Sequence, residues 1–325
     1  ISALLAKEIA KVTKGIHYPL LVASSYSGFV LWNSGLSASI PLSIAGKTAV
    51  MEKFAHGTIV PVSETVFSAQ TLIICAVIAI TMPIIMVLMM PKKKEDIVEV
   101  DPAIFADDDI PEPPKKSRKE MTPAQKQENS IILALIIVVV GLIYLVRYFA
   151  KGGALSLDIV NLIFIVLGLV FHKTPINYVK AVDESIKTCG ICLQFPFYGG
   201  LMGLMVDSGL AGTLAHAFVA ISTPKTFQLY TYYAGGIINM FVPSGGGQWA
   251  VQGPIMMPAA EMMGVSYGRT AMGIAWGDAW TNMIQPFWAL PLLAVARLGI
   301  GDIMGYTAVA LIWSGIVTSL GLLFL

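Results

Sequence analysis

Five long runs of apolar residues constrain the fold of this chain more than any other feature. A bilayer core of about 30 Å is crossed by roughly 20 apolar residues in helical form. Charged residues make up only 13% of the 325 residues, against about 25% in a typical soluble domain. The runs expected to be spanning helices are Val66–Met90, Ser130–Ala150, Leu157–Phe171, Met283–Leu298 and Tyr306–Leu325. The sequence therefore predicts an all-α, polytopic membrane protein.

Nearly half of the charged residues are gathered in one segment. Eight of the 21 Lys and Arg lie between Lys92 and Lys126, and ten of the 20 Asp and Glu lie between Glu95 and Glu128. This composition, together with its prolines, is typical of a solvated connector that is disordered. The flanking lysines place the connector on the cytoplasmic side. We therefore expect three parts: the remainder of a first transmembrane repeat (1–90), a polar cytoplasmic linker (91–129) and a second transmembrane repeat (130–325).

Several function classes are not supported by the sequence. The net charge is +1, and no basic stripe with interleaved aromatic residues suggests nucleic-acid binding. The pair Cys189 and Cys192 has the C-x-x-C spacing, but it lies in an apolar run without the further ligands that a zinc site needs. The four histidines do not stand beside a plausible nucleophile. We therefore predict no catalytic residues, no metal site and no cofactor.

Three further hydrophobic stretches are interrupted by Gly, Pro and polar residues. They are Tyr18–Leu42, Thr188–Met205 and Thr226–Pro258. Irregular backbone is tolerated at membrane depth only inside protein or beside a water-filled cavity, because lipid cannot satisfy its polar groups. In secondary transporters such breaks form discontinuous helices whose ends face the substrate. The stretches therefore predict discontinuous helices around a binding site.

Two of the breaks resemble each other weakly. Tyr26-Ser-Gly28, followed by Asn33-Ser-Gly35 and Pro41, is echoed by Tyr233-Ala-Gly235, Pro243-Ser-Gly245 and Pro254. This echo favours two related halves of about 200 residues, as in carriers built from inverted repeats. The first motif has far less membrane sequence before it than the second. On this interpretation, the beginning of the first half is missing from the chain.

The glycine run that begins the second break is a candidate anion site. Glycines allow close approach of a ligand to the backbone, and the free N–H groups and dipole of a following helix favour negative charge. The candidate residues are Ser244, Gly245, Gly246, Gly247, Gln248 and Trp249 from this break, with Asn33, Ser34, Ser37 and Ser39 from the first. Exposed carbonyls in such breaks could equally hold Na⁺, since hard cations take oxygen ligands.

Four charged residues lie in or beside apolar sequence of the second half: Asp207, Glu261, Arg269 and Asp278. Ionisable groups inside membrane segments are functional candidates by default. Asp278 is a candidate for coupling to a proton or cation, and Arg269 is a candidate partner for a substrate carboxylate. A location at helix ends in the interface would equally explain Arg269 and Asp207. Trp32, Trp249, Trp276, Trp280 and Trp288 could line a cavity for an apolar tail or form an interfacial belt.

Specific strings in the sequence resemble those of the bacterial short-chain fatty acid transporter family. They are HYPLLVASSYSGFVLW (17–32), FHKTPINY (171–178), LQFPFYGG (193–200), FVPSGGGQWAVQGPIMMPAA (241–260), QPFWALPLLA (285–294) and LGIGDIMGY (298–306). The resemblance implies a multi-pass protein of the bacterial inner membrane that moves acetoacetate, butyrate and similar monocarboxylates. It also implies a carrier built from inverted repeats and coupled to H⁺ or Na⁺. Family members carry further N-terminal helices, which this chain lacks.

Other functions remain open on the sequence alone. An anion site at a helix end does not distinguish a monocarboxylate from a dicarboxylate, so the substrate could be a dicarboxylate or another organic anion. A channel or an intramembrane enzyme is a further alternative, although an enzyme would need a nucleophile with a base in reach. The expected partners are a small carboxylate and the lipid bilayer, and the chain could also form a homodimer.

Overall fold

The computed structural model describes residues 2–101, 105, 120–187, 200, 203–204 and 207–325. Within these residues the regular secondary structure is entirely helical, which confirms the predicted all-α class. The chain forms two compact units. Unit 1 combines Ile1–Val100 with Gly190–Leu325, and unit 2 is Asp101–Cys189.

Two long apolar helices of unit 1 have the length of membrane spans. These are α5 (Ala69–Leu88) and α16 (Ile300–Phe324), of 20 and 25 residues. At a rise of about 1.5 Å per residue, each reaches across a hydrocarbon core of roughly 30 Å. The two pack closely: the Gln70 side-chain amide donates to the Gly321 carbonyl oxygen at 3.2 Å. The predicted runs Val66–Met90 and Tyr306–Leu325 are thereby confirmed.

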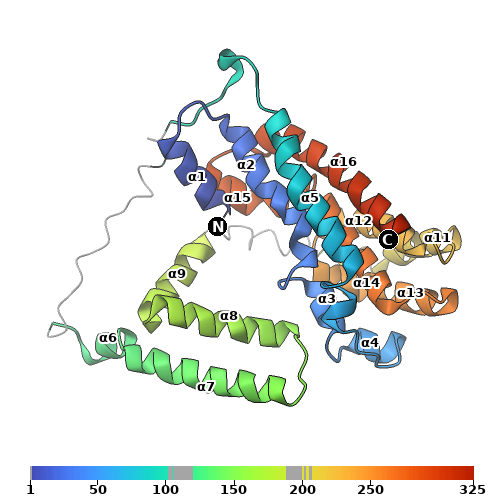
Figure 1. The fold of residues 1–325 in the computed structure, drawn as a ribbon, viewed down its shortest axis with the longest axis horizontal. Helices are drawn as coiled ribbons and strands as arrows, with labels where there is room; N and C mark the ends of the chain where they lie inside the picture. The colour runs from blue at the N-terminus through green and yellow to red at the C-terminus, as the bar shows by residue number, and fades with distance from the viewer. Residues whose placement is uncertain (1, 102–104, 106–119, 188–199, 201–202, 205–206) are drawn as a thin grey trace. The chain divides into compact units, whose positions relative to one another are not determined.

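The other helices of unit 1 are shorter and lie around and between these spans (Figure 1). The α-helices are α1 (Ser2–Val12), α2 (Tyr18–Ser27), α3 (Ser39–Ile44), α4 (Ala49–Phe54), α11 (Leu210–Ala220), α12 (Phe227–Asn239), α13 (Gly245–Met263), α14 (Tyr267–Thr281) and α15 (Ala289–Ala296). The short 3-10 helices are η1 (Gly28–Ser34), η2 (Val62–Glu64) and η3 (Lys94–Asp96). Two of the three interrupted stretches predicted from sequence, around η1 and between α12 and α13, are therefore broken helices.

Helix α14 forms the centre of unit 1. Every residue from 270 to 279 is buried, and the helix contacts α12, α13, η1, α3 and α16. Glycines allow α12 to approach α14 almost backbone to backbone. A Cβ on Gly277 would overlap the carbonyl oxygen of Tyr232, and a Cβ on Gly235 would lie 3.2 Å from the Ile274 carbonyl oxygen. Such close approach at small residues is how helices associate when lipid supplies no hydrophobic driving force between them.

Unit 2 is built on a packed pair of apolar helices, α7 (Ile131–Ala150) and α8 (Leu157–His172). A third helix, α9 (Pro175–Lys187), packs against both. Gly141 lets α8 approach, since a Cβ there would lie 2.6 Å from a methyl carbon of Val166. Its core is small: Val138, Leu145, Ile159, Val166 and Leu169. Much of the remaining apolar surface of α7 and α8 is exposed, as expected for helices that face lipid.

Helix α7 confirms the predicted run Ser130–Ala150, and α8 begins and ends close to the predicted run Leu157–Phe171. Helix α8 has only 16 residues. The chain bends by 113° between α8 and 175–183. The described part of the chain therefore contains three helices long and apolar enough to span a membrane, or four if this bent pair forms one span.

The prediction of an ordinary spanning helix over Met283–Leu298 is wrong. Residues 282–288 form turns, α15 has only eight residues, and Arg297 has a positive φ of 53°. Pro286 explains the interruption, because it lacks an N–H group and disfavours the helical conformation of the preceding residue. A third broken segment therefore exists where the sequence analysis expected a continuous helix.

Some predictions fall on residues outside the described part of the chain. Most of the third interrupted stretch, Thr188–Met205, belongs there, as do Cys189 and Cys192, and so does the linker over 102–104 and 106–119. The end of the linker is described and forms α6 (Pro123–Glu128), which starts with a reciprocal cap between Thr122 and Gln125. The proposed division into two transmembrane repeats stays a prediction.

Candidate functional site

Three broken segments of unit 1 meet beside α14. The first follows α2 and comprises η1 and residues 35–38, the second is the connection 240–244, and the third is 282–288. A Cβ added to Gly245 would lie 3.1 Å from both the Ser39 hydroxyl oxygen and the Trp32 ring. The indole N–H of Trp288 donates to the Pro243 carbonyl oxygen at 3.1 Å. The first break is thus in contact with the second, and the second with the third.

An aromatic wall connects the first and third breaks. The Phe29 ring stacks on Trp32 with 5.6 Å between ring centroids and on Tyr26 with 5.8 Å. Trp288 of the third break approaches the same Phe29 ring at 5.8 Å. These rings present apolar faces next to the polar groups of the breaks, which suits a ligand with an apolar tail and a polar head.

A buried amide and a buried carboxylate join the first break to α14. The Asn33 Nδ2 group donates to Asp278 Oδ2 at 2.8 Å and to the Ala275 carbonyl oxygen at 3.1 Å. Both side chains have no exposed surface. Asp278 forms no ion pair among the described residues, and its Oδ1 atom has no hydrogen-bond partner among them. A charged carboxylate in such a place is unstable unless a proton or cation accompanies it.

The glycine run forms the first turn of α13. The Ser244 hydroxyl oxygen caps this helix by accepting from the Gly247 N–H at 3.3 Å. Gly246 is exposed, and a Cβ at that position would meet no atom within 4 Å. The first-turn N–H groups of a helix have no intrahelical partner and carry its partial positive charge. The first turn of α13 therefore combines an exposed glycine, Gly246, with a helix end that favours an anion.

Two buried glutamines anchor α13 to α12. Gln248 Nε2 donates to the Gly235 carbonyl oxygen at 2.9 Å and to Gln252 Oε1 at 3.1 Å. Gln252 Nε2 in turn donates to the Thr231 carbonyl oxygen at 3.4 Å. Gln248 Oε1 is left without a partner among the described residues. The predicted site residue Gln248 is thus held in place chiefly through its amide N–H group.

A second set of amides surrounds the third break. Asn239, at the end of α12, donates to Thr281 Oγ1 at 3.0 Å and to Asn282 Oδ1 at 2.9 Å. The Thr281 hydroxyl donates to the Gly236 carbonyl oxygen at 2.9 Å. Gln285 Oε1 accepts from the Phe287 N–H at 2.9 Å. All of these polar side chains are buried.

The breaks and the helices beside them contain an unusual number of buried polar atoms without a protein partner among the described residues. The donors are Trp32 Nε1, Trp249 Nε1, Trp276 Nε1, Asn282 Nδ2 and Gln285 Nε2, and the acceptors are Asn33 Oδ1, Asn239 Oδ1, Gln248 Oε1 and Asp278 Oδ1. Folded proteins leave few such atoms unpaired, because each costs about 1–3 kcal/mol. A concentration of them in one region marks a place where a ligand, ion or water binds.

The structure brings together many of the residues predicted from sequence. Six of them are buried in or beside the breaks: Asn33, Ser34, Gly245, Gln248, Trp249 and Asp278. Ser39 is half-buried against Gly245, and Gly247 is half-buried in the first turn of α13. Ser37, Ser244 and Gly246 are exposed. Among the residues that the structure describes, no group of three or more His, Cys, Asp or Glu could hold a metal ion.

Arg269 lies apart from this cluster. It is exposed in the first turn of α14, where its backbone N–H donates to Ser266 Oγ and its guanidinium donates to the Leu325 carbonyl oxygen at 3.0 Å. Nine residues separate it from Asp278, or roughly 13 Å along a helix. Asp207 is also exposed. Both residues are therefore placed as the alternative interpretation from the sequence expected, which located them at helix ends and not in the site.

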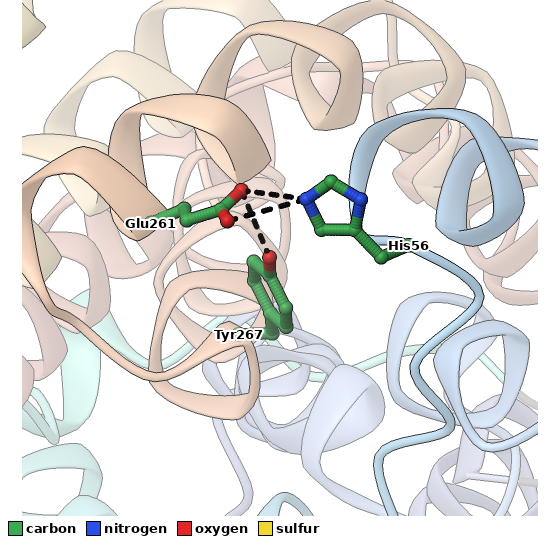
Figure 2. A network of polar contacts seen from close by, with 3 residues as sticks. All are labelled: His56, Glu261 and Tyr267. Carbon is green, nitrogen blue, oxygen red and sulfur yellow. Dashed lines mark hydrogen bonds and ion pairs between the residues drawn. The ribbon is translucent and has the colours of Figure 1, made fainter.

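Glu261 belongs to a surface network that ties the two parts of unit 1 together. Both of its carboxylate oxygens lie within 3.2 Å of His56 Nε2, and the Tyr267 hydroxyl donates to Oε2 at 3.3 Å. Figure 2 shows the three side chains converging from the end of α13, the start of α14 and the turn after α4. The side chains of His56 and Glu261 are 75% and 51% exposed, so this network lies outside the buried site.

Asn239, Asn282 and Gln285 did not emerge from the sequence analysis. Asn282 and Gln285 border or lie within a run that was interpreted as a continuous span, and Asn239 precedes the glycine run. The signal that could have identified them is an amide shortly before a proline inside an apolar run, as in Asn282 and Gln285 before Pro286. Such a pattern combines a helix break with a hydrogen-bonding side chain at the same depth.

Comparison with known proteins identifies the family. The family model described as short chain fatty acid transporter matches residues 1–325. A protein of Escherichia coli named "Putative short-chain fatty acid transporter" is 41% identical over 324 residues, which cover 99% of this chain and 72% of that protein. A Haemophilus influenzae protein of the same name is 40% identical over 333 residues, covering 100% of this chain and 74% of that protein.

No solved structure matches this chain. The family and the relatives are transporters and not enzymes, which agrees with the apolar spans and the buried breaks of unit 1. The chain is a membrane protein that belongs to the short-chain fatty acid transporter family.

Proposed function

We propose that the protein is a secondary transporter that carries acetoacetate, butyrate and similar short monocarboxylates across the bacterial cytoplasmic membrane by symport with H⁺ or Na⁺. The observation that carries this proposal is the contact of Gly245 with Ser39 and Trp32. It joins two broken helices that are far apart in sequence. Discontinuous helices that meet in this way form the substrate sites of many carriers.

The chemistry of the meeting point suits a short acid. The first turn of α13 offers unpaired N–H groups and a partial positive charge to a carboxylate. The rings of Phe29, Trp32 and Trp288 offer apolar surface to a short acyl tail. A monocarboxylate needs one polar subsite and one apolar subsite, and the first turn of α13 and these rings are the groups that we propose for them.

Asp278 supports coupling to a cation. It has no exposed surface and no basic partner among the described residues, so its charge needs neutralisation before the surrounding helices close on it. A proton on the unpartnered Oδ1 atom would neutralise it directly. A sodium ion would do so with oxygen ligands, of which Asn33 Oδ1 is one candidate. Either ion would link the state of Asp278 to the movement of the substrate.

A dicarboxylate is the main alternative substrate. It would need a second cationic or helix-end subsite within reach of the first. Arg269, which the sequence offered for that purpose, is exposed and bonded to the carbonyl oxygen of Leu325. The arrangement therefore favours a single carboxylate.

The test is uptake of radiolabelled butyrate and acetoacetate into proteoliposomes under an imposed pH gradient or Na⁺ gradient. Saturable uptake that responds to one gradient supports the proposal and identifies the coupling ion. Labelled succinate is measured in parallel. If succinate moves and neither monocarboxylate does, the substrate class is wrong. If no acid moves under any gradient, the proposed transport activity is wrong.

A further inference from the structure

An internal repeat relates the first and third broken segments. Both consist of a helix, a break and a short helix: α2, η1 and α3 in one case, and α14, residues 282–288 and α15 in the other. Tyr18, Gly28 and Asn33 recur 249 residues later as Tyr267, Gly277 and Asn282, and Pro41 recurs 250 residues later as Pro291. Both prolines occupy the third position of their short helices. This pairing fits the observed elements better than the echo around Tyr233.

The two segments also make reciprocal contacts. Asn33 Nδ2 donates to the carbonyl oxygen of Ala275 at 3.1 Å, and the Tyr26 hydroxyl donates to the carbonyl oxygen of Asn282 at 2.8 Å. In the repeat, Tyr26 corresponds to Ala275 and Asn33 corresponds to Asn282. A contact made in both directions between equivalent positions is the signature of a two-fold relationship. The third break is therefore the counterpart of the first and shares its central position.

The hydrogen bonds around Asn282 fix the orientation of its amide. The Gly236 carbonyl oxygen can only accept, so the Thr281 hydroxyl donates to it. The Thr281 oxygen therefore accepts from Asn239, whose nearby atom must be Nδ2. The same Nδ2 group then donates to Asn282, whose nearby atom must be Oδ1. Asn282 Nδ2 is consequently a donor, and it has no partner among the described residues.

The orientation of the Gln285 amide is fixed in the same way. The backbone N–H of Phe287 can only donate, so the atom that lies 2.9 Å from it is Gln285 Oε1. Gln285 Nε2 is therefore a donor without a partner among the described residues. The N–H of Gln285 donates to the Thr281 carbonyl oxygen at 3.0 Å, as in a helical turn. Asn282 and Gln285, three residues apart in that turn, thus lie on the same side.

We propose that the side-chain amides of Asn282 and Gln285 bind the carboxylate of the transported acid. This inference rests on the proposed function and names the subsite that holds the polar head of the substrate. The two residues have exposures of 0% and 2%, so bulk water does not satisfy their N–H groups. A carboxylate has two oxygens, each able to accept from one of the two amides. Trp288 belongs to the same break and connects it to the aromatic wall through its contact with Phe29.

Neutral donors also suit a carrier better than a fixed positive charge. An Arg or Lys would hold the carboxylate strongly and would remain charged in the membrane after the substrate leaves. Two amides give directional recognition without that charge. The first turn of α13 is adjacent through the bond from Trp288 to Pro243, so its N–H groups can add to the same anion subsite.

The test uses Asn282→Asp and Gln285→Glu. Each variant keeps the shape of the side chain and the oxygen that accepts from Asn239 or Phe287, and replaces only the unpartnered NH₂ group with oxygen. The KM for butyrate uptake in proteoliposomes should rise about 10-fold to 100-fold in either variant, as expected for the loss of a hydrogen bond to a charged group. The Kd for butyrate should rise equally, measured by tryptophan fluorescence on the monodisperse fraction. Gln285→Met, which adds no charge, repeats the test if Gln285→Glu does not fold.

The matched control is Gln228→Glu. Gln228 is a buried amide whose NH₂ group is bonded, since it donates to Gln70 Oε1 at 2.8 Å and accepts from Gln70 Nε2 at 3.2 Å. This control should lower the Tm and leave the KM within two-fold. If the wild-type protein transports butyrate and both break variants keep its KM and Kd within two-fold, a water molecule occupies the amides and the inference is wrong. If the wild-type protein transports no carboxylate, the proposed function fails instead.

Discussion

The first and third broken segments of unit 1 have the same sequence of elements and opposite hydrogen-bonding character. Asn33 uses its amide N–H group for Ala275 and Asp278, and leaves its oxygen without a partner. Asn282, at the equivalent position, uses its oxygen for Asn239 and leaves its N–H group unpaired. At these two positions the first break therefore presents an unpaired acceptor, Asn33 Oδ1, and the third break presents an unpaired donor, Asn282 Nδ2.

The correspondence between the two segments therefore does not extend to the hydrogen bonds of their asparagines. Acceptor oxygens suit a proton or a cation, whereas donor N–H groups suit a carboxylate. A cation and an anion that occupy the two breaks together neutralise each other. Joint occupancy would therefore lower the cost of carrying either charge through a medium of low dielectric constant. Coupled transport would follow from this asymmetry.

The largest expected effect is that of Asp278→Asn on coupling. The variant keeps an oxygen that accepts from Asn33 Nδ2 but removes the ionisable group of α14 that contacts the first break. Uptake driven by a gradient should fall roughly 10-fold to 100-fold and should no longer exceed uptake without a gradient. The measurement is the initial rate of butyrate uptake into proteoliposomes with and without the gradient.

Asp207→Asn is the control for this prediction, because Asp207 is an exposed carboxylate of the same unit. Its gradient-driven uptake should stay within two-fold of wild type. Coupling that persists in Asp278→Asn would show that Asp278 does not bind the coupling ion, and the contrast between Asn33 and Asn282 would then not explain coupling.

The second prediction compares the equivalent glycines of the two segments. A Cβ on Gly277 would overlap the Tyr232 carbonyl oxygen, whereas a Cβ on Gly28 would meet nothing within 4 Å. Gly277→Ala should cost about 3 kcal/mol and lower the Tm by roughly 6–12 °C. Gly28→Ala should change it by less than about 2 °C, because its φ of −61° suits alanine. Thermal unfolding in detergent measures both, and equal shifts would contradict the close α12–α14 contact.

The sequence predicted the helical class, three of the spans and two of the breaks, because these depend on local composition. A run such as Ser130–Ala150 is apolar at nearly every position, and its helix begins and ends almost where the run does. The prediction of a spanning helix over Met283–Leu298 was wrong, because it relied on the apolar composition of the run and did not consider the effect of Pro286 on the backbone. The close contact of Gly277 with the backbone of α12 could not be predicted either, since it depends on Tyr232, a residue far from Gly277 in the sequence.

The candidate site was predicted in part for similar reasons. The glycine run and Asp278 were identifiable, because three consecutive glycines and a charged residue within apolar sequence are both visible in the sequence without knowledge of their neighbours. A contact of Asn33 with the substrate stays a prediction: its Nδ2 group donates to Asp278 and Ala275, and its Oδ1 atom has no partner among the described residues. The unpaired state of Asn282 and Gln285 could not be predicted, because it depends on which neighbouring groups satisfy each amide atom.

The third prediction separates packing from ligand contact within the glycine run. A Cβ on Gly245 would press on Ser39 and Trp32 at 3.1 Å, so Gly245→Ala should cost about 1–2 kcal/mol and lower the Tm by roughly 2–8 °C. Gly246→Ala places its methyl group in the open space before α13. It should leave the Tm unchanged and raise the KM for butyrate about 3-fold by hindering approach of the carboxylate. A Tm loss in Gly246→Ala, or none in Gly245→Ala, would contradict the contact between the first and second breaks.

The smallest expected effect concerns the surface network of His56, Glu261 and Tyr267, which joins the turn after α4 to the end of α13 and the start of α14. His56 and Glu261 are both substantially exposed, and such ion pairs contribute less than about 1 kcal/mol. Glu261→Gln and His56→Gln should each lower the Tm by no more than about 4 °C. The double variant should lose little beyond either single variant, since each removes the same interaction. Thermal unfolding of the four proteins measures this coupling. A coupling well above 1 kcal/mol would mean that the two segments are held together at the surface as well as at the buried breaks.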